Sequence, residues 1–326
     1  MKTMRIGNTS LDASRIGYGC MELGGARTRE PATVDERRKA VSVVETALDA
    51  GINFFDHADI YRFGKSEELF SQIWNARSSL RQKIILQSKC GIWFADDPIS
   101  GYPGRYDFSH DHIVESVEGI LKRLKTDYLD LLLLHRPDAL VEPEEVARAF
   151  DELHASGKVR WFGVSNHTPG QIELLKKCVD EPLVVNQLEL NPLHVHLIDE
   201  GIVLNQDLPT WPVRGYGTLD YCRLHDITIQ AWAPLARGQA SGAAPAGRDS
   251  RSAALSSVVE SMAKAKNVSR EAILLAWILR HPAHIQPIIG TTNLNRIKAS
   301  CQADGIELSR EEWYSLFTAG RGASVP

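Results

Sequence analysis

Apolar runs alternate with amphipathic segments along almost the whole chain. Eight short runs rich in Val, Ile, Leu and Phe each lead into a stretch with the spacing of an amphipathic helix. A strand that is buried on both faces of a parallel sheet has this continuous apolar character. The predicted strands lie at residues 15–20, 52–58, 83–89, 128–135, 158–166, 183–190, 227–235 and 284–291.

The segments between these runs carry the signals of helix ends. Thr33 is a plausible cap for a helix that ends at Gly51, and Ser109 or His110 begins another. Pro143 lies in the first turn of a third helix, and Gly157 lies at its end. Further helices are predicted at 66–76, 168–179, 218–225, 268–281 and 293–303, and a last one at 309–320 follows the repeat.

Eight strand–helix units predict a parallel sheet with right-handed crossovers. Eight units in 326 residues suit a closed (β/α)8 TIM barrel that forms a single domain over residues 1–326. A short N-terminal segment would cap the barrel floor, and the extra helix would follow at the C-terminus. A doubly wound open sheet is the alternative. It fits less well because the nearest match to GxGxxG, at 17–22, has Glu22 in place of the third glycine.

Two segments fall outside the alternation. Residues 201–217 hold two prolines and several turn formers, and residues 236–253 are rich in Gly, Ala and Ser. A loop that follows a strand at the catalytic face often acts as a lid. We expect a lid at 236–253, whereas 201–217 is either a lid or a surface insertion.

Composition excludes several classes of protein. The net charge of −4 gives no basic surface for nucleic acid. The five cysteines are scattered without a CxxC pair, so neither a disulfide framework nor a metal site is expected. The N-terminus lacks the apolar core of a signal peptide. No run approaches the ~18 apolar residues of a membrane span. We therefore expect a cytoplasmic protein without a membrane partner.

Polar, ionisable residues stand at the ends of three successive predicted strands. Asp56 and Tyr61 follow the second strand, Lys89 ends the third and His135 ends the fourth. In a barrel, the carboxyl ends of these strands are neighbours on one rim, so the four side chains are predicted to meet in one site.

The chemistry of this set favours a reduction. Tyrosine is a poor acid at neutral pH, but an ammonium about 4 Å away contributes roughly 4 kcal/mol, or about 3 pKa units. Lys89 is thus expected to bring the pKa of Tyr61 close to neutrality, while Asp56 pairs with Lys89. His135 can orient a carbonyl oxygen by a hydrogen bond. A group that protonates a carbonyl needs a hydride donor beside it.

Here the chain resembles the aldo-keto reductases. Residues 52–61 with Gly64-Lys65-Ser66-Glu67 match a signature of that family, as do residues 127–135 and 157–166. Further matches are Gln187, Ala233-Pro234-Leu235, and residues 288–291 with Arg296, all in family order. The segments SKCGI at 88–92 and HRPD at 135–138 resemble a bacterial branch of predicted oxidoreductases in this family.

The resemblance implies an NADP(H)-dependent reductase that converts an aldehyde or ketone to an alcohol. Tyr61 would donate the proton, Lys89 and Asp56 would tune it, and His135 would orient the carbonyl. The cofactor would lie across the carboxyl face, with Trp232 stacked on the nicotinamide. The implied cofactor contacts are Gly19, Cys20, Met21, Asp56, Ser165, Asn166, Gln187, Trp232, Ala233, Pro234, Leu235, Arg237, Gly238, Ile289, Gly290, Thr291 and Arg296.

Some positions leave the interpretation open. Gly290 stands where the family often has a phosphate-binding lysine, so NAD(H) remains an alternative cofactor. Trp93 and Phe94 either line the substrate pocket or pack under a loop. His57, His110, His112, His194 and His196 are expected to be surface or loop residues, and Cys20 and Cys90 to be inert. The partner would be a small carbonyl or alcohol, and the protein a monomer or small homo-oligomer.

Two other functions stay open at this point. Lys89 could instead form a Schiff base with a carbonyl substrate, if burial lowers its pKa. The chain could also be a nucleotide-sensing subunit without catalysis. The identity of the substrate has no readable code in the sequence.

Overall fold

Eight parallel strands close into a barrel in the computed structural model, which describes residues 1–77, 79–203, 215–242 and 250–326. Each strand pairs with its neighbours in chain order, and β12 closes the ring by pairing with β3. The predicted TIM barrel is confirmed, and the open-sheet alternative is excluded. The barrel strands are β3 (Gly17–Gly19), β4 (Phe54–Asp56), β5 (Ile85–Cys90), β8 (Leu129–Leu134), β9 (Val159–Ser165), β10 (Leu183–Glu189), β11 (Thr228–Trp232) and β12 (Gln286–Ile289).

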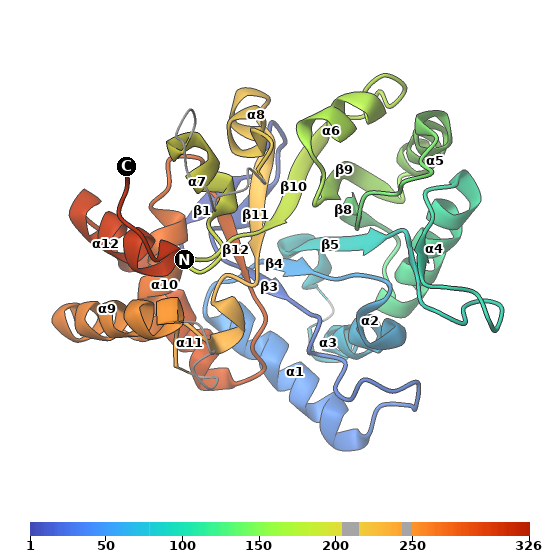
Figure 1. Ribbon diagram of the computed structural model, residues 1–326. Helices are drawn as coiled ribbons and strands as arrows, with labels where there is room; N and C mark the ends of the chain where they lie inside the picture. The colour runs from blue at the N-terminus through green and yellow to red at the C-terminus, as the bar shows by residue number, and fades with distance from the viewer. Residues whose placement is uncertain (78, 204–214, 243–249) are drawn as a thin grey trace.

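Helices surround the barrel, as Figure 1 shows. Thr33 caps the first helix, α1 (Val34–Asp49), through a reciprocal capping box with Glu36. Ser109 caps α4 (His110–Leu124), as the sequence predicts. The helix expected at 66–76 is broken in two, and neither α7 nor α9 was predicted. The helices are α1 (Val34–Asp49), α2 (Lys65–Phe70), α3 (Ile73–Ala76), α4 (His110–Leu124), α5 (Pro143–Ala155), α6 (Pro169–Leu175), α7 (His196–Ile202), α8 (Thr218–Leu224), α9 (Ser250–Lys266), α10 (Arg270–Leu279), α11 (Leu294–Cys301) and α12 (Arg310–Arg321).

A hairpin of β1 (Thr3–Arg5) and β2 (Asp12–Ser14) closes the barrel floor. Ile6, Leu11 and Ala13 are buried there against side chains from the barrel strands. The Gly7 amide donates to the Thr228 hydroxyl at 2.6 Å, which ties the hairpin to the start of β11. The expected cap at the floor is therefore present.

The extra C-terminal helix α12 packs on the outer layer. Trp313 of α12 stacks on the fully buried Trp277 of α10, with ring centroids 5.2 Å apart. The Trp313 indole also donates to the Trp277 carbonyl at 3.0 Å. This stacking and hydrogen bond hold α12 against α10, although the indole N–H of Trp277 itself has no partner among the described residues.

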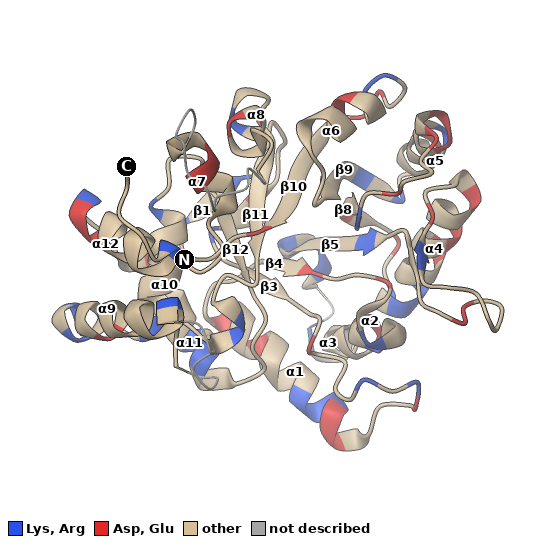
Figure 2. Cartoon of the chain, in the orientation of Figure 1, with Lys and Arg blue, Asp and Glu red and all other residues tan. Residues whose placement is uncertain are grey.

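Charges are distributed over the outer helices, where both signs are interspersed, while the barrel strands carry few (Figure 2). The described helices include none that is both long and apolar enough to span a bilayer. The segment 201–217 falls largely on residues 204–214, which lie outside the described residues. Of the segment 236–253, residues 243–249 lie outside them; its described parts are the 3-10 turn at Ala236–Gly238 and the start of α9.

Candidate active site

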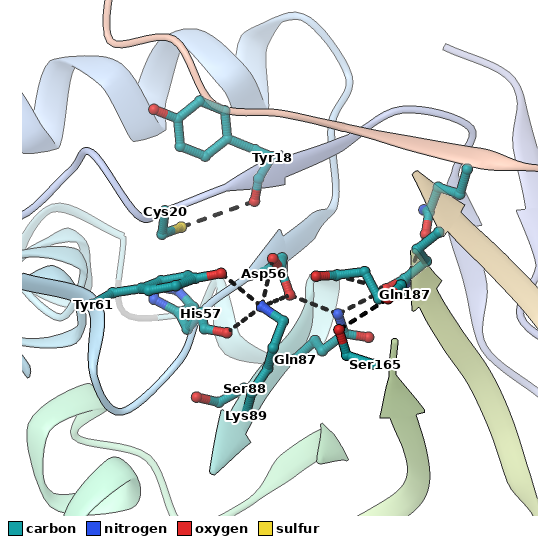
Figure 3. A network of polar contacts seen from close by, with 12 residues as sticks. Tyr18, Cys20, Asp56, His57, Tyr61, Gln87, Ser88, Lys89, Ser165 and Gln187 are labelled. Carbon is teal, nitrogen blue, oxygen red and sulfur yellow. Dashed lines mark hydrogen bonds and ion pairs between the residues drawn. The ribbon is translucent and has the colours of Figure 1, made fainter. Parts of the chain in front are cut away.

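Lys89 is the centre of a buried polar cluster at the carboxyl end of the barrel (Figure 3). Its ammonium lies 2.7 Å from Asp56 Oδ1 and 2.8 Å from Asp56 Oδ2. The same ammonium donates to the Tyr61 hydroxyl at 3.0 Å and to the His57 carbonyl at 2.8 Å. The rings of Tyr61 and His135 face each other edge-on, with centroids 5.9 Å apart. The structure thus brings together the four side chains predicted from the strand ends.

A tight turn places Tyr61 over this cluster. The 3-10 segment η1 (Tyr61–Gly64) contains Arg62 and Phe63 in left-handed conformation, and Gly64 follows with φ of +86°. A Cβ on Gly64 would lie 2.7 Å from Cδ of Arg123. Glycine is required here both by its φ and by this close approach. The glycine of the 64–67 motif therefore shapes the turn that aims Tyr61 at Lys89.

The surroundings of Lys89 favour its charged form. Burial alone would lower the pKa of Lys89, but Asp56 and Tyr61 outweigh it, so the pKa is raised above its ordinary value. A lysine that acts as an amine nucleophile needs the opposite shift. This geometry disfavours the Schiff-base hypothesis.

Tyr61 departs from the sequence-based expectation. Burial raises the pKa of Tyr61 above its ordinary value, with Lys89 lowering it and Asp56 raising it again. The prediction that Lys89 brings this phenol close to neutrality is wrong for the isolated chain, because burial of the phenol raises its pKa more than the ammonium lowers it, and Asp56 adds to the rise. Tyr61 is therefore a fully protonated donor, whose anion Lys89 is placed to stabilise.

His135 remains a neutral imidazole. Burial, followed by the charges of Lys89 and Arg136, holds the pKa of His135 well below its ordinary value. Its Nδ1 is buried without a hydrogen-bond partner among the described residues. A neutral histidine can donate one hydrogen bond without adding charge to the site.

His57 and His112 are not surface residues, which corrects the expectation. Histidine 57 is completely buried, its ring 4.7 Å from Phe70, and neither ring nitrogen has a partner within the described part of the chain. Burial lowers the pKa of His57 to about 3. His112 is buried in α4 beside Trp93, and burial lowers its pKa as well. His196, expected on the surface or in a loop, is half-buried at the start of α7.

A second ionisable cluster supports the Tyr61 turn from behind. Glu67 is fully buried and accepts from Ser88 Oγ at 2.8 Å and from Arg123 Nε at 2.7 Å. Burial, reinforced by Glu67, raises the pKa of Asp59 to about 7. The charge of Arg123 lowers the pKa of both carboxyl groups and so opposes the effect of burial. No sequence pattern indicates this pairing, because Arg123 lies on α4.

Beside the cluster, Ser165, Asn166 and Trp232 form a hydrogen-bonded group at the ends of β9 and β11. The Asn166 amide donates to Ser165 Oγ at 2.8 Å, and the Trp232 indole donates to Asn166 Oδ1 at 3.2 Å. The Arg136 guanidinium lies 5.7 Å from the centroid of the Trp232 ring. Gln187 is buried on β10, and its main-chain carbonyl accepts from Ser165 Oγ at 2.9 Å. An amide, a hydroxyl and an indole face suit a planar carboxamide-bearing ring.

Thr291 and Arg296, which the resemblance implies as cofactor contacts, lie around the start of α11. Asn293 caps this helix, and Arg296 stands in its first turn, where its Nε donates to Glu271 at 3.0 Å. Helix N-termini and guanidinium groups both favour anions. Thr291 lies in the loop between β12 and α11, and its main-chain carbonyl accepts from the Tyr18 hydroxyl at 3.1 Å. The turn at 235–238 follows β11 and holds Arg237 in left-handed conformation.

Gly19 ends β3, and Cys20 and Met21 follow it on the same rim. The Cys20 amide donates to the Asp56 carbonyl at 2.8 Å, and Met21 is exposed. Burial raises the pKa of the Cys20 and Cys90 thiols well above the usual range, so both are inert as expected.

Trp93 and Phe94 belong to a hairpin that projects after β5. Trp93 lies on β6 (Ile92–Trp93), which pairs with β7 (Arg105–Tyr106), and its indole donates to Asp107 at 3.0 Å. Phe94 packs on Phe63 of the Tyr61 turn, with centroids 4.9 Å apart. Phe94 therefore contacts the turn that carries Tyr61.

The family model for the aldo/keto reductase family matches residues 15–318. Among curated proteins, a 6-dehydroglucose reductase of Novosphingobium aromaticivorans is 35% identical, over 99% of this chain and 96% of that protein. Oxidoreductase YdhF of Escherichia coli is 36% identical, over 89% of this chain and 90% of that protein.

Solved structures show the same architecture. An aldo-keto reductase from Klebsiella pneumoniae in complex with NADPH superposes with a TM-score of 0.75 and 26% identity, covering 100% of this chain and 96% of that one. A glycerol dehydrogenase from Gluconobacter oxydans reaches a TM-score of 0.80 at 24% identity, covering 98% of this chain and 94% of that one. This likeness concerns the fold alone.

Proposed function

We propose, from the premise that this chain belongs to the aldo/keto reductase family, that it reduces an aldehyde or ketone to an alcohol with NADPH. The observation that carries the proposal is the position of the Lys89 ammonium, 2.7 Å from Asp56 and 3.0 Å from the Tyr61 hydroxyl. When bound, the nicotinamide cofactor supplies the hydride. The chain then has to orient the carbonyl, exclude water and deliver one proton.

The residues present fit such a cofactor. The Asn166 amide and Ser165 hydroxyl would hold the carboxamide with Gln187, and the Trp232 face would support the ring. Arg296 at the start of α11 would bind an adenosine phosphate. A related aldo-keto reductase from Klebsiella pneumoniae has been solved with NADPH, which supports this choice over NADH.

Tyr61 would donate its phenolic proton to the carbonyl oxygen. Its raised pKa keeps the phenol protonated, and Lys89 stabilises the phenolate as it forms. Neutral His135 would donate a hydrogen bond to the same oxygen. Asp56 holds Lys89 in place and offsets the cost of burying its charge.

The proposal is tested by titrating the protein with NADPH and NADH and then screening carbonyl compounds with the preferred cofactor. The panel includes sugar aldehydes, because a 35% identical relative is a 6-dehydroglucose reductase. We expect NADPH to bind more tightly than NADH and at least one aldehyde to be reduced. Tight NADPH binding with no reduction across the panel would instead support the nucleotide-sensing alternative.

A further inference from the structure

Four buried glutamines occupy the barrel interior beneath the site. They are Gln87 on β5, Gln187 on β10, Gln230 on β11 and Gln286 on β12, and none is more than 3% exposed. Barrel interiors are usually filled by branched apolar side chains. An amide buried without hydrogen bonds is costly, so four of them together require a connected network.

The four side chains form such a network. Gln87 Nε2 donates to Asp56 Oδ1 at 2.6 Å and to Gln230 Oε1 at 2.8 Å. Gln187 also donates to Gln230 Oε1, at 3.0 Å. Gln230 donates to Gln286 at 3.0 Å, and Gln286 donates to the Ser14 carbonyl at 2.8 Å on the barrel floor. We call this network the glutamine ladder; part of it is visible in Figure 3.

Both ends of the ladder fix its direction. The Ser14 carbonyl can only accept a hydrogen bond, and so can an ionised Asp56. If Gln87 were turned over, its oxygen would face both the Asp56 carboxylate and the Gln230 oxygen, which are acceptors. Only one orientation of each amide therefore places a donor opposite every acceptor in the ladder. In that orientation, Gln87 presents an N–H to Asp56.

This contact lies on the atom that holds Lys89. Asp56 Oδ1 accepts from Gln87 at 2.6 Å and lies 2.7 Å from the Lys89 ammonium. We propose that Gln87 is a positioning residue for the reaction, which fixes the Asp56 carboxylate so that Lys89 stays directed at the Tyr61 hydroxyl. The inference rests on the proposed function, in which Tyr61 is the proton donor.

The direction of the effect follows from charge. Without the Gln87 donor, Asp56 Oδ1 has only the Lys89 ammonium as a partner among the described residues. Asp56 then attracts the ammonium more strongly and draws it away from Tyr61. The Tyr61 phenolate then loses stabilisation, so the pKa of Tyr61 rises. The other ionisable groups around this pair come from the neighbouring elements and are unchanged by the substitution: Cys20 after β3, His57 after β4, Asp59 and Glu67 behind the turn, Arg123 on α4, and His135 with Arg136 after β8.

Gln286 supplies the matched control. It is as completely buried as Gln87 and belongs to the same ladder, but its contacts are Gln230 and Ser14 rather than Asp56. Gln87→Met and Gln286→Met each replace one buried amide by an apolar side chain of similar size. A purely structural role predicts similar consequences for both variants, whereas a positioning role separates them.

The experiment compares the pH dependence of alcohol oxidation with NADP⁺, in which Tyr61 must accept a proton and the rate rises with pH through its pKa. Gln87→Met should move this rise upward by about one pH unit, which is a tenfold change in the acidity of Tyr61. The Gln286→Met profile should match that of the wild type. Equal shifts in both variants, or none in either, would overturn the proposal.

A second readout does not depend on turnover. In protein without cofactor, tyrosine labelled with 13C at Cζ reports phenol ionisation by NMR, and Tyr61→Phe identifies the signal of Tyr61. Gln87→Met should raise this titration, while Gln286→Met should not. If no carbonyl is reduced but the titration moves, the proposed function fails and the Gln87–Asp56 coupling stands.

Should Gln87→Met not fold, Gln87→Asn keeps an amide inside the barrel but is one methylene shorter, so it withdraws the donor from Asp56. The Tyr61 titration should again move upward. An unchanged titration in this variant would equally overturn the proposal.

Discussion

The Lys89 ammonium donates to the Tyr61 hydroxyl at 3.0 Å. Its other two N–H groups donate to Asp56 and to the His57 carbonyl. All three N–H groups of the ammonium therefore have partners in the barrel. The orientation is fixed before any substrate arrives, because none of these partners lies on the barrel exterior. Pre-organised donors of this kind stabilise developing charge without reorganisation.

Replacing Tyr61 by Phe should abolish most turnover. The ring is kept and the donor is lost, so kcat should fall by about 10²–10⁴-fold, the usual contribution of a general acid. NADPH binding, followed by quenching of protein fluorescence, should change by less than about twofold, because hydride transfer and proton transfer use different groups. Tyr102→Phe, at an exposed tyrosine, is the control. Turnover close to that of the wild type in Tyr61→Phe would refute the mechanism.

Arg296→Ala should weaken NADPH far more than NADH. A guanidinium–phosphate pair contributes about 1.5–3 kcal/mol, which corresponds to roughly a 10- to 100-fold higher Kd for NADPH. NADH lacks the 2′-phosphate, so its Kd should stay nearly constant. Lys298→Ala, on the same helix but in its last turn, controls for general loss of positive charge. Parallel weakening of both cofactors would place the phosphate site elsewhere.

His57→Leu should make the fold less sensitive to acid. Its pKa is about 3 in the folded chain and about 6.5 when unfolded, so the unfolded state binds more protons between these values. Wild-type stability therefore falls as the pH drops below about 6.5, by roughly 2 kcal/mol at pH 5 from this group. Urea unfolding at pH 7 and pH 5 should show a smaller loss in the variant. An identical loss in both proteins would contradict the burial of a neutral His57.

Gly320→Ala should destabilise the docking of α12. A Cβ at this position would lie 1.9 Å from the Pro192 carbonyl oxygen, so the helix would have to move away from the loop after β10. Overpacking of this kind costs about 1–3 kcal/mol. Gly170→Ala in α6 is the matched control, since no atom lies within 4 Å of its Cβ and alanine is the better helix former. The midpoint temperature of thermal unfolding should drop for Gly320→Ala and not for Gly170→Ala.

The sequence predicted the barrel because each strand is a continuous apolar run and each run is followed by a helical repeat. The four site residues could be found for the same reason: they interrupt or follow those runs at the carboxyl ends. Residue 64 was recognised as part of a motif, and its left-handed turn explains why a glycine is needed there.

The glutamine ladder was missed although its signal was present. Gln87 and Gln230 each stand two residues before a predicted site residue, Lys89 and Trp232, and side chains two apart in a strand share a face. A polar residue inside an apolar run can thus point into the barrel. The pKa of Tyr61 was mispredicted for a different reason, because the effects of burial and of the Asp56 charge depend on atomic distances.

The ladder ends in a bond between Gln286 and the Ser14 carbonyl, which lie 272 residues apart. Contacts of such separation form late, because the entropy of closing a long loop must be overcome first. Asp56, Tyr61 and Lys89 lie within one short stretch of chain and can approach one another early in folding. Their support from below is completed when β12 joins β3 and seals the barrel. A ribosome-bound chain that ends before β12 should therefore hold these residues on a sheet that is still open, so the timing of barrel closure sets when the enzyme becomes competent.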